Sequence, residues 1–234
     1  MDTQANWIAI DKRTWRFEDE GVRFFLLLGA EKALLVDSGM TVSNARDLAC
    51  QLTDMPIMLF NTHCDPDHVA GNGQFDEVFV SPAELVHPAA PKYPQTVHPV
   101  WNGDVIDLGN RELEAIALPG HTPGSTALLD RATGMLFSGD PIQRDGRIFM
   151  FGPMRNLAAY IASLQRLKRW EGRVTSIWPS HAVCPVDFAA VDELYEGACA
   201  VQKGEAPYSD EEVHGCAVRA YDVGPSILLC DRPE

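Results

Sequence analysis

Positive charge is scarce in this sequence of 234 residues. Lysine and arginine together number 19, against 33 aspartates and glutamates, which gives a formal net charge of −14. A protein with this balance repels phosphate groups, so nucleic acid and anionic membrane surfaces are not expected as partners. The densest basic cluster, residues 166–169, is too short to reverse that expectation. The sequence leaves the oligomeric state open.

Long apolar runs and export signals are also missing. The longest apolar run, residues 24–28, is far shorter than the roughly 20 residues that a membrane-spanning helix needs. Residues 1–7 contain neither the basic nor the apolar stretch of a signal peptide. The six cysteines form no CxxC pair, which favours reduced thiols that mostly fill the core. A cytoplasmic location is the resulting expectation.

Apolar runs alternate with amphipathic segments along the chain. Helices are predicted over 156–170 and 187–203, where apolar residues recur at intervals of three and four, and a shorter one between 41 and 52. Strands are predicted in the other apolar runs, namely 22–28, 33–37, 56–60, 77–80, 113–118, 126–129, 135–137, 174–178, 217–223 and 226–229. Residues 141–155 are expected to form a loop. Because no linker divides these segments, we predict an α/β fold with two packed sheets in a single domain, residues 1–234.

Side chains that bind metals stand where predicted strands end. The densest group is HCDPDH, residues 63–68. Residues i and i+2 of an extended segment point the same way, so His63 and Asp65 can converge on one ion while Cys64 points into the fold. Four further strand ends each carry one candidate, namely Asp37, His121, Asp140 and His181. A single histidine beside a strand is more often a packing residue, but repetition of the pattern favours a metal site.

The order and spacing of these motifs resemble the metallo-β-lactamase superfamily of metal-dependent hydrolases. That family carries HxHxDH on one loop, a later histidine in a GHTPG-like turn, an aspartate in an SGD-like turn and a final histidine. This sequence has HCDPDH at 63–68, GHTPGS at 120–125, SGD at 138–140 and PSH at 179–181, and its DSG at 37–39 matches a structural turn of the family. The resemblance implies an αββα four-layer sandwich with the metal site on loops at one edge of the two sheets.

The resemblance also implies roles for seven residues around two divalent ions. One ion would be held by His63, Asp65 and His121. The other would be held by Asp67, His68 and His181. Asp140 would bridge both ions, and Asp67 would be the catalytic residue, orienting a metal-bound hydroxide and moving its proton. The implied activity is hydrolysis of an ester-like bond in a small molecule, such as a thioester or a lactone.

Asp65 departs from the family pattern, which usually has histidine at this position. Zn²⁺ is the ion that the resemblance implies. Because the exchange adds a negative charge and a harder donor to the site, Fe or Mn²⁺ are alternatives. A carboxylate here also resembles the flavodiiron proteins, which keeps a di-iron oxidoreductase as an alternative function. A single occupied metal, with Asp65 outside its ligand shell, is another alternative. The last alternative is a metal-binding module without catalytic activity.

Overall fold

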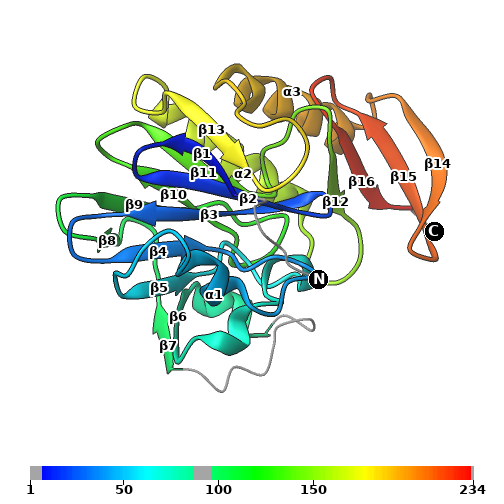
Figure 1. Ribbon diagram of the computed structural model, residues 1–234. Helices are drawn as coiled ribbons and strands as arrows, with labels where there is room; N and C mark the ends of the chain where they lie inside the picture. The colour runs from blue at the N-terminus through cyan, green and yellow to red at the C-terminus, as the bar shows by residue number, and fades with distance from the viewer. Residues whose placement is uncertain (1–6, 87–95, 233–234) are drawn as a thin grey trace. The chain divides into compact units, whose positions relative to one another are not determined.

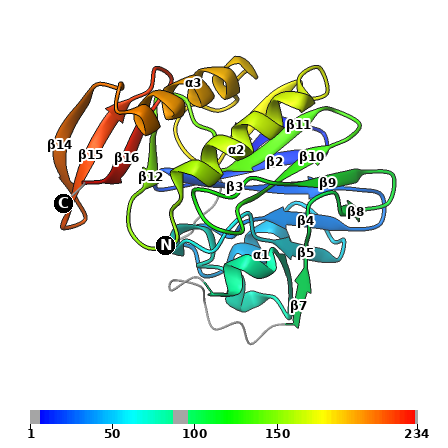
Figure 2. The same cartoon turned by 180° about the vertical axis from the view of Figure 1, so that it is seen from behind.

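The computed structural model describes residues 7–86 and 96–232. The chain divides into two compact units by its internal contacts. Unit one contains Met1–Ile116 and Leu128–Ala132, and unit two contains Ala117–Ala127 and Thr133–Glu234. The elements of both are labelled in Figures 1 and 2.

The described part of unit one is built on a seven-stranded sheet whose strands follow one another in chain order (Figure 1). They are β1 (Trp7–Asp11), β2 (Thr14–Asp19), β3 (Val22–Leu28), β4 (Ala33–Val36), β5 (Ile57–Phe60), β6 (Glu77–Val80) and β7 (Thr96–Pro99). Neighbours are antiparallel from β1 to β4 and parallel from β4 to β7. The apolar runs of β3 and β4 are almost wholly buried, as their near-continuous apolar sequence predicts. This sheet therefore carries much of the core of unit one.

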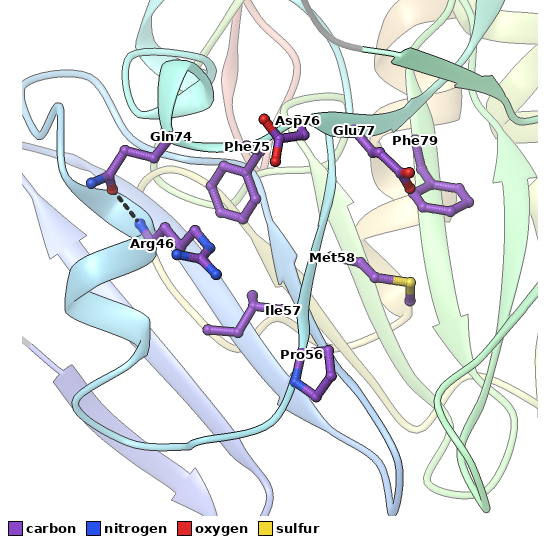
Figure 3. Close-up of a pocket in the computed structure, with 9 residues that line it drawn as sticks. All are labelled: Arg46, Pro56, Ile57, Met58, Gln74, Phe75, Asp76, Glu77 and Phe79. Atoms are coloured by element: carbon purple, nitrogen blue, oxygen red, sulfur yellow. Dashed lines mark hydrogen bonds between the residues drawn. The ribbon is translucent and has the colours of Figure 1, made fainter.

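The sheet opens between β5 and β6 at their amino ends. These two strands pair at one position, Phe60 with Phe79, whereas β4–β5 and β6–β7 each pair at four. The divergence leaves a hollow of about 390 Å³. Figure 3 shows Met58 and Phe79 on one side of it and Arg46 on the other. Since the metal-ligand candidates follow the carboxyl end of β5, this hollow is not their site.

A buried arginine ties together three segments of unit one. The strands β8 (Val105–Asp107) and β9 (Glu112–Ala117) pair antiparallel there, and β10 (Thr126–Asp130) is divided between the units. Arg111 lies 2.9 Å from the Asp130 carboxylate, and both side chains are almost fully buried. It also donates to three oxygens near β2 and β3: the carbonyls of Arg13 and Leu28 and the hydroxyl of Thr14.

Unit two combines two longer helices with short strands. Its described elements are β11 (Met135–Gly139), β12 (Arg147–Met150), α2 (Leu157–Leu167), β13 (Ser176–Pro179), α3 (Ala189–Lys203), β14 (Tyr208–Val213), β15 (Cys216–Asp222) and β16 (Ile227–Asp231). β11 and β13 are parallel, and a four-stranded sheet has the order β12-β16-β15-β14. Helices α2 and α3 pack side by side (Figure 2), with Lys168 and Asp192 paired at 2.6 Å. The predicted cap of α2 is confirmed, because the Asn156 side chain accepts a hydrogen bond from the Ala159 amide.

The structure differs from the sequence-based expectations in several elements. The helix predicted between 41 and 52 is a single turn, α1 (Ala45–Ala49). The segment 141–155 is not wholly a loop, because β12 lies within it and pairs with β16. Five more strands lie outside the predicted ranges, namely β1, β2, β7, β8 and β14. The sequence of β14, YSDEEV, is polar and exposed on most positions, so it lacks the apolar alternation by which a strand is identified.

The cysteines occupy different environments from those expected. All six are free thiols, as predicted, and Cys64 is fully buried. Cys64 is the one buried cysteine of the six, and Cys50 and Cys216 are exposed, so the expectation that the cysteines mostly fill the core is wrong. Across the described residues, none of the helices combines the length and apolarity that crossing a membrane requires.

Candidate metal centre

The first group of candidate ligands follows β5 in unit one. The chain leaves β5 at Phe60, bends at Thr62 and is extended at Asp65, after which comes a single 3-10 turn, Pro66–His68. The side chains of His63 and His68 are completely buried, that of Asp65 is 11% exposed and that of Asp67 is 29% exposed. This gradient leaves Asp67 as the ligand candidate of this group that water reaches most easily.

The donor atoms of this group have the spacing of metal ligands. Two atoms bound at about 2.1 Å to one tetrahedral ion lie about 3.4 Å apart. Nε2 of His63 lies 3.5 Å from Oδ2 of Asp65, and Nε2 of His68 lies 3.6 Å from Oδ2 of Asp67. The residues thus form two imidazole–carboxylate pairs, and each pair belongs to a different ion in the predicted assignment. The donor set and its spacing fit divalent cations.

Hydrogen bonds to Nδ1 orient both imidazoles. Nδ1 of His68 lies 2.9 Å from Oδ2 of Asp37, and Nδ1 of His63 lies 3.0 Å from the Thr62 hydroxyl. Asp37 also accepts hydrogen bonds from the Thr62 amide and hydroxyl, both at 2.7 Å. Partners of this kind set the ring orientation of metal-bound histidines and direct Nε2 to the ion. The sequence identified Asp37 as a strand-end carboxylate, but not its contact with His68, 31 positions away.

The second group of candidate ligands lies in unit two. One carboxylate oxygen, Oδ2 of Asp140, is 3.5 Å from Nε2 of His121 and 3.3 Å from Nε2 of His181. Nδ1 of His121 is 2.8 Å from the carbonyl oxygen of Phe149. Asp140 therefore lies between two imidazoles, which is the arrangement that a bridging carboxylate requires.

Tyr160 of α2 organises the loops that carry this second group. Its buried hydroxyl donates to the carbonyl of Pro141, the residue after Asp140, at 2.7 Å. Burial raises the pKa of Tyr160 far above its usual range, so the hydroxyl stays protonated and keeps donating. Gly120, before His121, packs so tightly on the backbone of Tyr160 that a Cβ would lie 2.4 Å from the tyrosine Cα. A side chain larger than hydrogen at position 120 would displace the loop.

Arg144 and Arg147 of segment 141–155 form ion pairs with residues of unit two. Arg144 pairs with Glu193, and Arg147 pairs with Glu211. The aromatic rings of Phe149 and Phe151 contact each other edge to face at 5.4 Å. These two arginines therefore help to hold the segment in unit two.

Within each unit, the structure brings the predicted ligands together. Each unit has its own cluster, with His63, Asp65, Asp67 and His68 in unit one and His121, Asp140 and His181 in unit two. That both clusters share the same ions stays a prediction.

Comparison with known proteins tests the resemblance that the motifs suggest. A family model described as the metallo-beta-lactamase superfamily matches residues 19–169, more than half of the chain. The chain belongs to the metallo-β-lactamase superfamily. Its α/β fold is that of the superfamily, and the protein is a metal-dependent hydrolase. The superfamily binds divalent metals, and both clusters consist of the histidine and aspartate side chains that bind them.

Individual relatives and solved structures extend the comparison. The acyl-coenzyme A thioesterase MBLAC2 of Gallus gallus is 30% identical over 208 residues, covering 71% of this chain and 75% of the thioesterase. The mitochondrial persulfide dioxygenase ETHE1 of Bos taurus is 28% identical over 130 residues, covering 54% of this chain and 50% of the dioxygenase. The solved structure of a metallo-beta-lactamase from Pontibacter korlensis superposes with a TM-score of 0.67 at 17% identity, covering 81% of this chain and 96% of that one. The last comparison supports the fold alone.

Proposed function

We propose that this protein hydrolyses acyl thioesters of small molecules. The observation that carries the proposal is the similarity to the acyl-coenzyme A thioesterase MBLAC2, which extends over 71% of this chain. In the reaction, water adds its oxygen to the acyl carbon, the carbon–sulfur bond breaks, and a carboxylic acid and a thiol are released.

We also propose that the two clusters form one dinuclear centre and that residues 1–234 act as a single domain. The family model supports this, since it runs from unit one into unit two without interruption. His63, Asp65 and His121 would hold one ion. Asp67, His68 and His181 would hold the other. Asp140 would bridge them, in keeping with its place between two imidazoles.

The bound cations would supply Lewis acidity toward the acyl oxygen and would make water a better nucleophile at neutral pH. Asp67 is the residue of the first cluster best placed to handle protons, since its side chain is 29% exposed beside a fully buried His68. Its carboxylate would orient the attacking water, accept a proton and pass it to the departing sulfur. Asp37 would keep the His68 ring fixed during this transfer.

A direct assay tests the substrate class. The purified protein, stripped of metal with a chelator and reloaded separately with Zn²⁺, Mn²⁺ or Fe²⁺, is offered acyl-CoA thioesters, a lactone and a phosphodiester. We expect thiol release from the thioesters to exceed turnover of the other two, and to vanish without metal. If no reloaded form released thiol from any thioester, the proposed substrate class would be wrong.

An oxidoreductase is the second candidate function. It is favoured by the similarity to the persulfide dioxygenase ETHE1 over 54% of this chain, together with the carboxylate at position 65. The chain spans about half the length of that relative. Oxygen consumption by the iron-loaded protein in the presence of a persulfide, without thioester hydrolysis, would favour this candidate.

Asp65→His should shift metal preference toward zinc. Imidazole is a softer donor than carboxylate, and the replacement removes a negative charge next to His63, whose Nε2 lies 3.5 Å from Asp65. We expect the ratio of zinc to iron plus manganese, measured by elemental analysis of protein purified without added metal, to rise several-fold. The control is Asp76→His, which places a histidine on the exposed surface of unit one. An unchanged ratio in Asp65→His would place Asp65 outside the ligand shell.

A further inference from the structure

A buried carboxylate outside the predicted ligand set bonds the middle of residues 61–68, the ligand loop, which carries four of the candidate ligands. Glu84 lies on a short 3-10 turn, Pro82–Val86, and its side chain is completely buried. Its Oε2 accepts a hydrogen bond of 2.8 Å from the backbone amide of Cys64. Cys64 separates His63 from Asp65, so Glu84 acts on the peptide that joins two candidate ligands. No motif in the sequence marks Glu84 as part of the site.

This contact completes the anchoring of the loop. Thr62 is held by Asp37, through hydrogen bonds of its amide and hydroxyl. The next anchored position is Cys64, held by Glu84 on its amide and by burial of its side chain. His63 thus lies between two residues whose backbones are tied to buried carboxylates. Small backbone rotations at Cys64 would change the 3.5 Å separation of the His63 and Asp65 donor atoms.

Burial of an acid at this place needs a specific reason. Moving a carboxylate out of water is costly unless it is hydrogen-bonded, and a bond to a charged acceptor is shorter and stronger than one between neutral groups. Because Cys64 is fully buried, its amide needs an acceptor within the protein. The Glu84 carboxylate supplies that acceptor and fixes where the amide points.

We propose that Glu84 is a positioning residue of the metal centre, holding the Cys64 amide so that His63 and Asp65 keep the spacing of two ligands of one ion. The inference rests on the proposed metal centre. It is independent of the substrate, because its test measures metal binding.

The test compares Co²⁺ binding to Glu84→Ala and to Glu84→Gln. Residues that orient metal ligands typically contribute 10- to 100-fold to metal affinity. We therefore expect the Co²⁺ dissociation constant of Glu84→Ala, measured by competition with a chelator, to rise by about 10- to 100-fold. Glu84→Gln retains a carbonyl oxygen that can accept from the amide, so its dissociation constant should stay close to that of the unsubstituted protein. The visible spectrum of the Co²⁺ form should change in Glu84→Ala and be restored in Glu84→Gln.

Two further variants separate positioning from a general effect on the core. Glu84→Asp keeps the charge but places the carboxylate one methylene farther from the Cys64 amide. It replaces Glu84→Ala in the binding measurement if Glu84→Ala does not fold. The matched control is Glu114→Ala, which removes a buried carboxylate of β9 that pairs with Arg131. Glu114→Ala should bind Co²⁺ as the unsubstituted protein does.

Three results would overturn the proposal. The first is unchanged Co²⁺ affinity and spectrum in Glu84→Ala, or in Glu84→Asp where that variant replaces it. The second is an equal loss of affinity in Glu84→Gln, since holding the amide would then not be the cause. The third is an equal loss in Glu114→Ala. If the unsubstituted protein bound Co²⁺ but released no thiol from thioesters, the proposed substrate class would fail while the role of Glu84 could still be measured.

Discussion

Asp140→Ala is expected to lower thioester hydrolysis by more than about 100-fold, since even residues that only orient metal ligands contribute 10- to 100-fold. Oδ2 of Asp140 lies within 3.5 Å of the donor nitrogens of both His121 and His181. The cluster of unit two has three proposed ligands, and the substitution removes the only carboxylate among them. Metal retained after gel filtration, measured by elemental analysis, should fall together with the activity.

The fold should survive this substitution. The Asp140 side chain borders the cluster of imidazoles, and the apolar core of unit two does not depend on it. Circular dichroism should therefore match that of the unsubstituted protein. The control is Glu205→Ala, which removes an exposed carboxylate of unit two and should keep full activity. Wild-type rates in Asp140→Ala would exclude the bridging role.

Arg111→Met should destabilise unit one by about 3–5 kcal/mol, the usual cost of breaking a buried ion pair from one side. The substitution leaves the buried Asp130 carboxylate without the guanidinium that lies 2.9 Å from it. It also removes the donor to the Arg13 and Leu28 carbonyls and to the Thr14 hydroxyl. Burial lowers the pKa of Arg111, and the nearby Asp130 carboxylate counteracts that shift.

Urea unfolding of the metal-free protein measures this loss. Arg111→Met combined with Asp130→Leu should recover part of the stability, because no buried charge is then left alone. The control is Glu112→Gln, which breaks the exposed ion pair between Glu112 and Arg131, whose side chains are 53% and 39% exposed. Its unfolding midpoint should change little. Equal midpoints for Arg111→Met and the unsubstituted protein would contradict the assigned role.

Local sequence was sufficient to predict the parts of the site that depend on neighbouring residues. The alternation of His63, Cys64 and Asp65 follows from an extended backbone, and the structure places Cys64 in the core between two candidate ligands. The cap at Asn156 follows from the chemistry of an amide side chain at a helix start. The membership of the superfamily followed from the order of four short motifs.

The contacts that orient the ligands could not be predicted in the same way. Asp37 reaches His68 across 31 positions, and Glu84 reaches Cys64 across 20. Both pairings arise from the sheet and its connections, which bring the segments together, and neither has a periodic signal in the sequence. For Tyr160, the helical spacing predicted burial, but not the hydrogen bond to the carbonyl of Pro141. Tertiary hydrogen bonds of this kind become visible only when the fold is known.

Strands β5 and β6 pair at a single position, fewer than any other neighbouring pair in the sheet of unit one. We call this weakly paired boundary the seam. Across the seam, β6 is held mainly by packing of its buried Val78 and Val80. The β4–β5 and β6–β7 pairs are each joined at four consecutive positions. Local opening along the seam breaks few backbone hydrogen bonds, so we expect it to require less free energy than opening within β1 to β5. The ligand loop leaves β5 on the side of this seam that keeps its ladder with β4. Glu84, which follows β6, lies across the seam from this loop and bonds the Cys64 amide, so opening along the seam would release that hold on the candidate ligands His63 and Asp65.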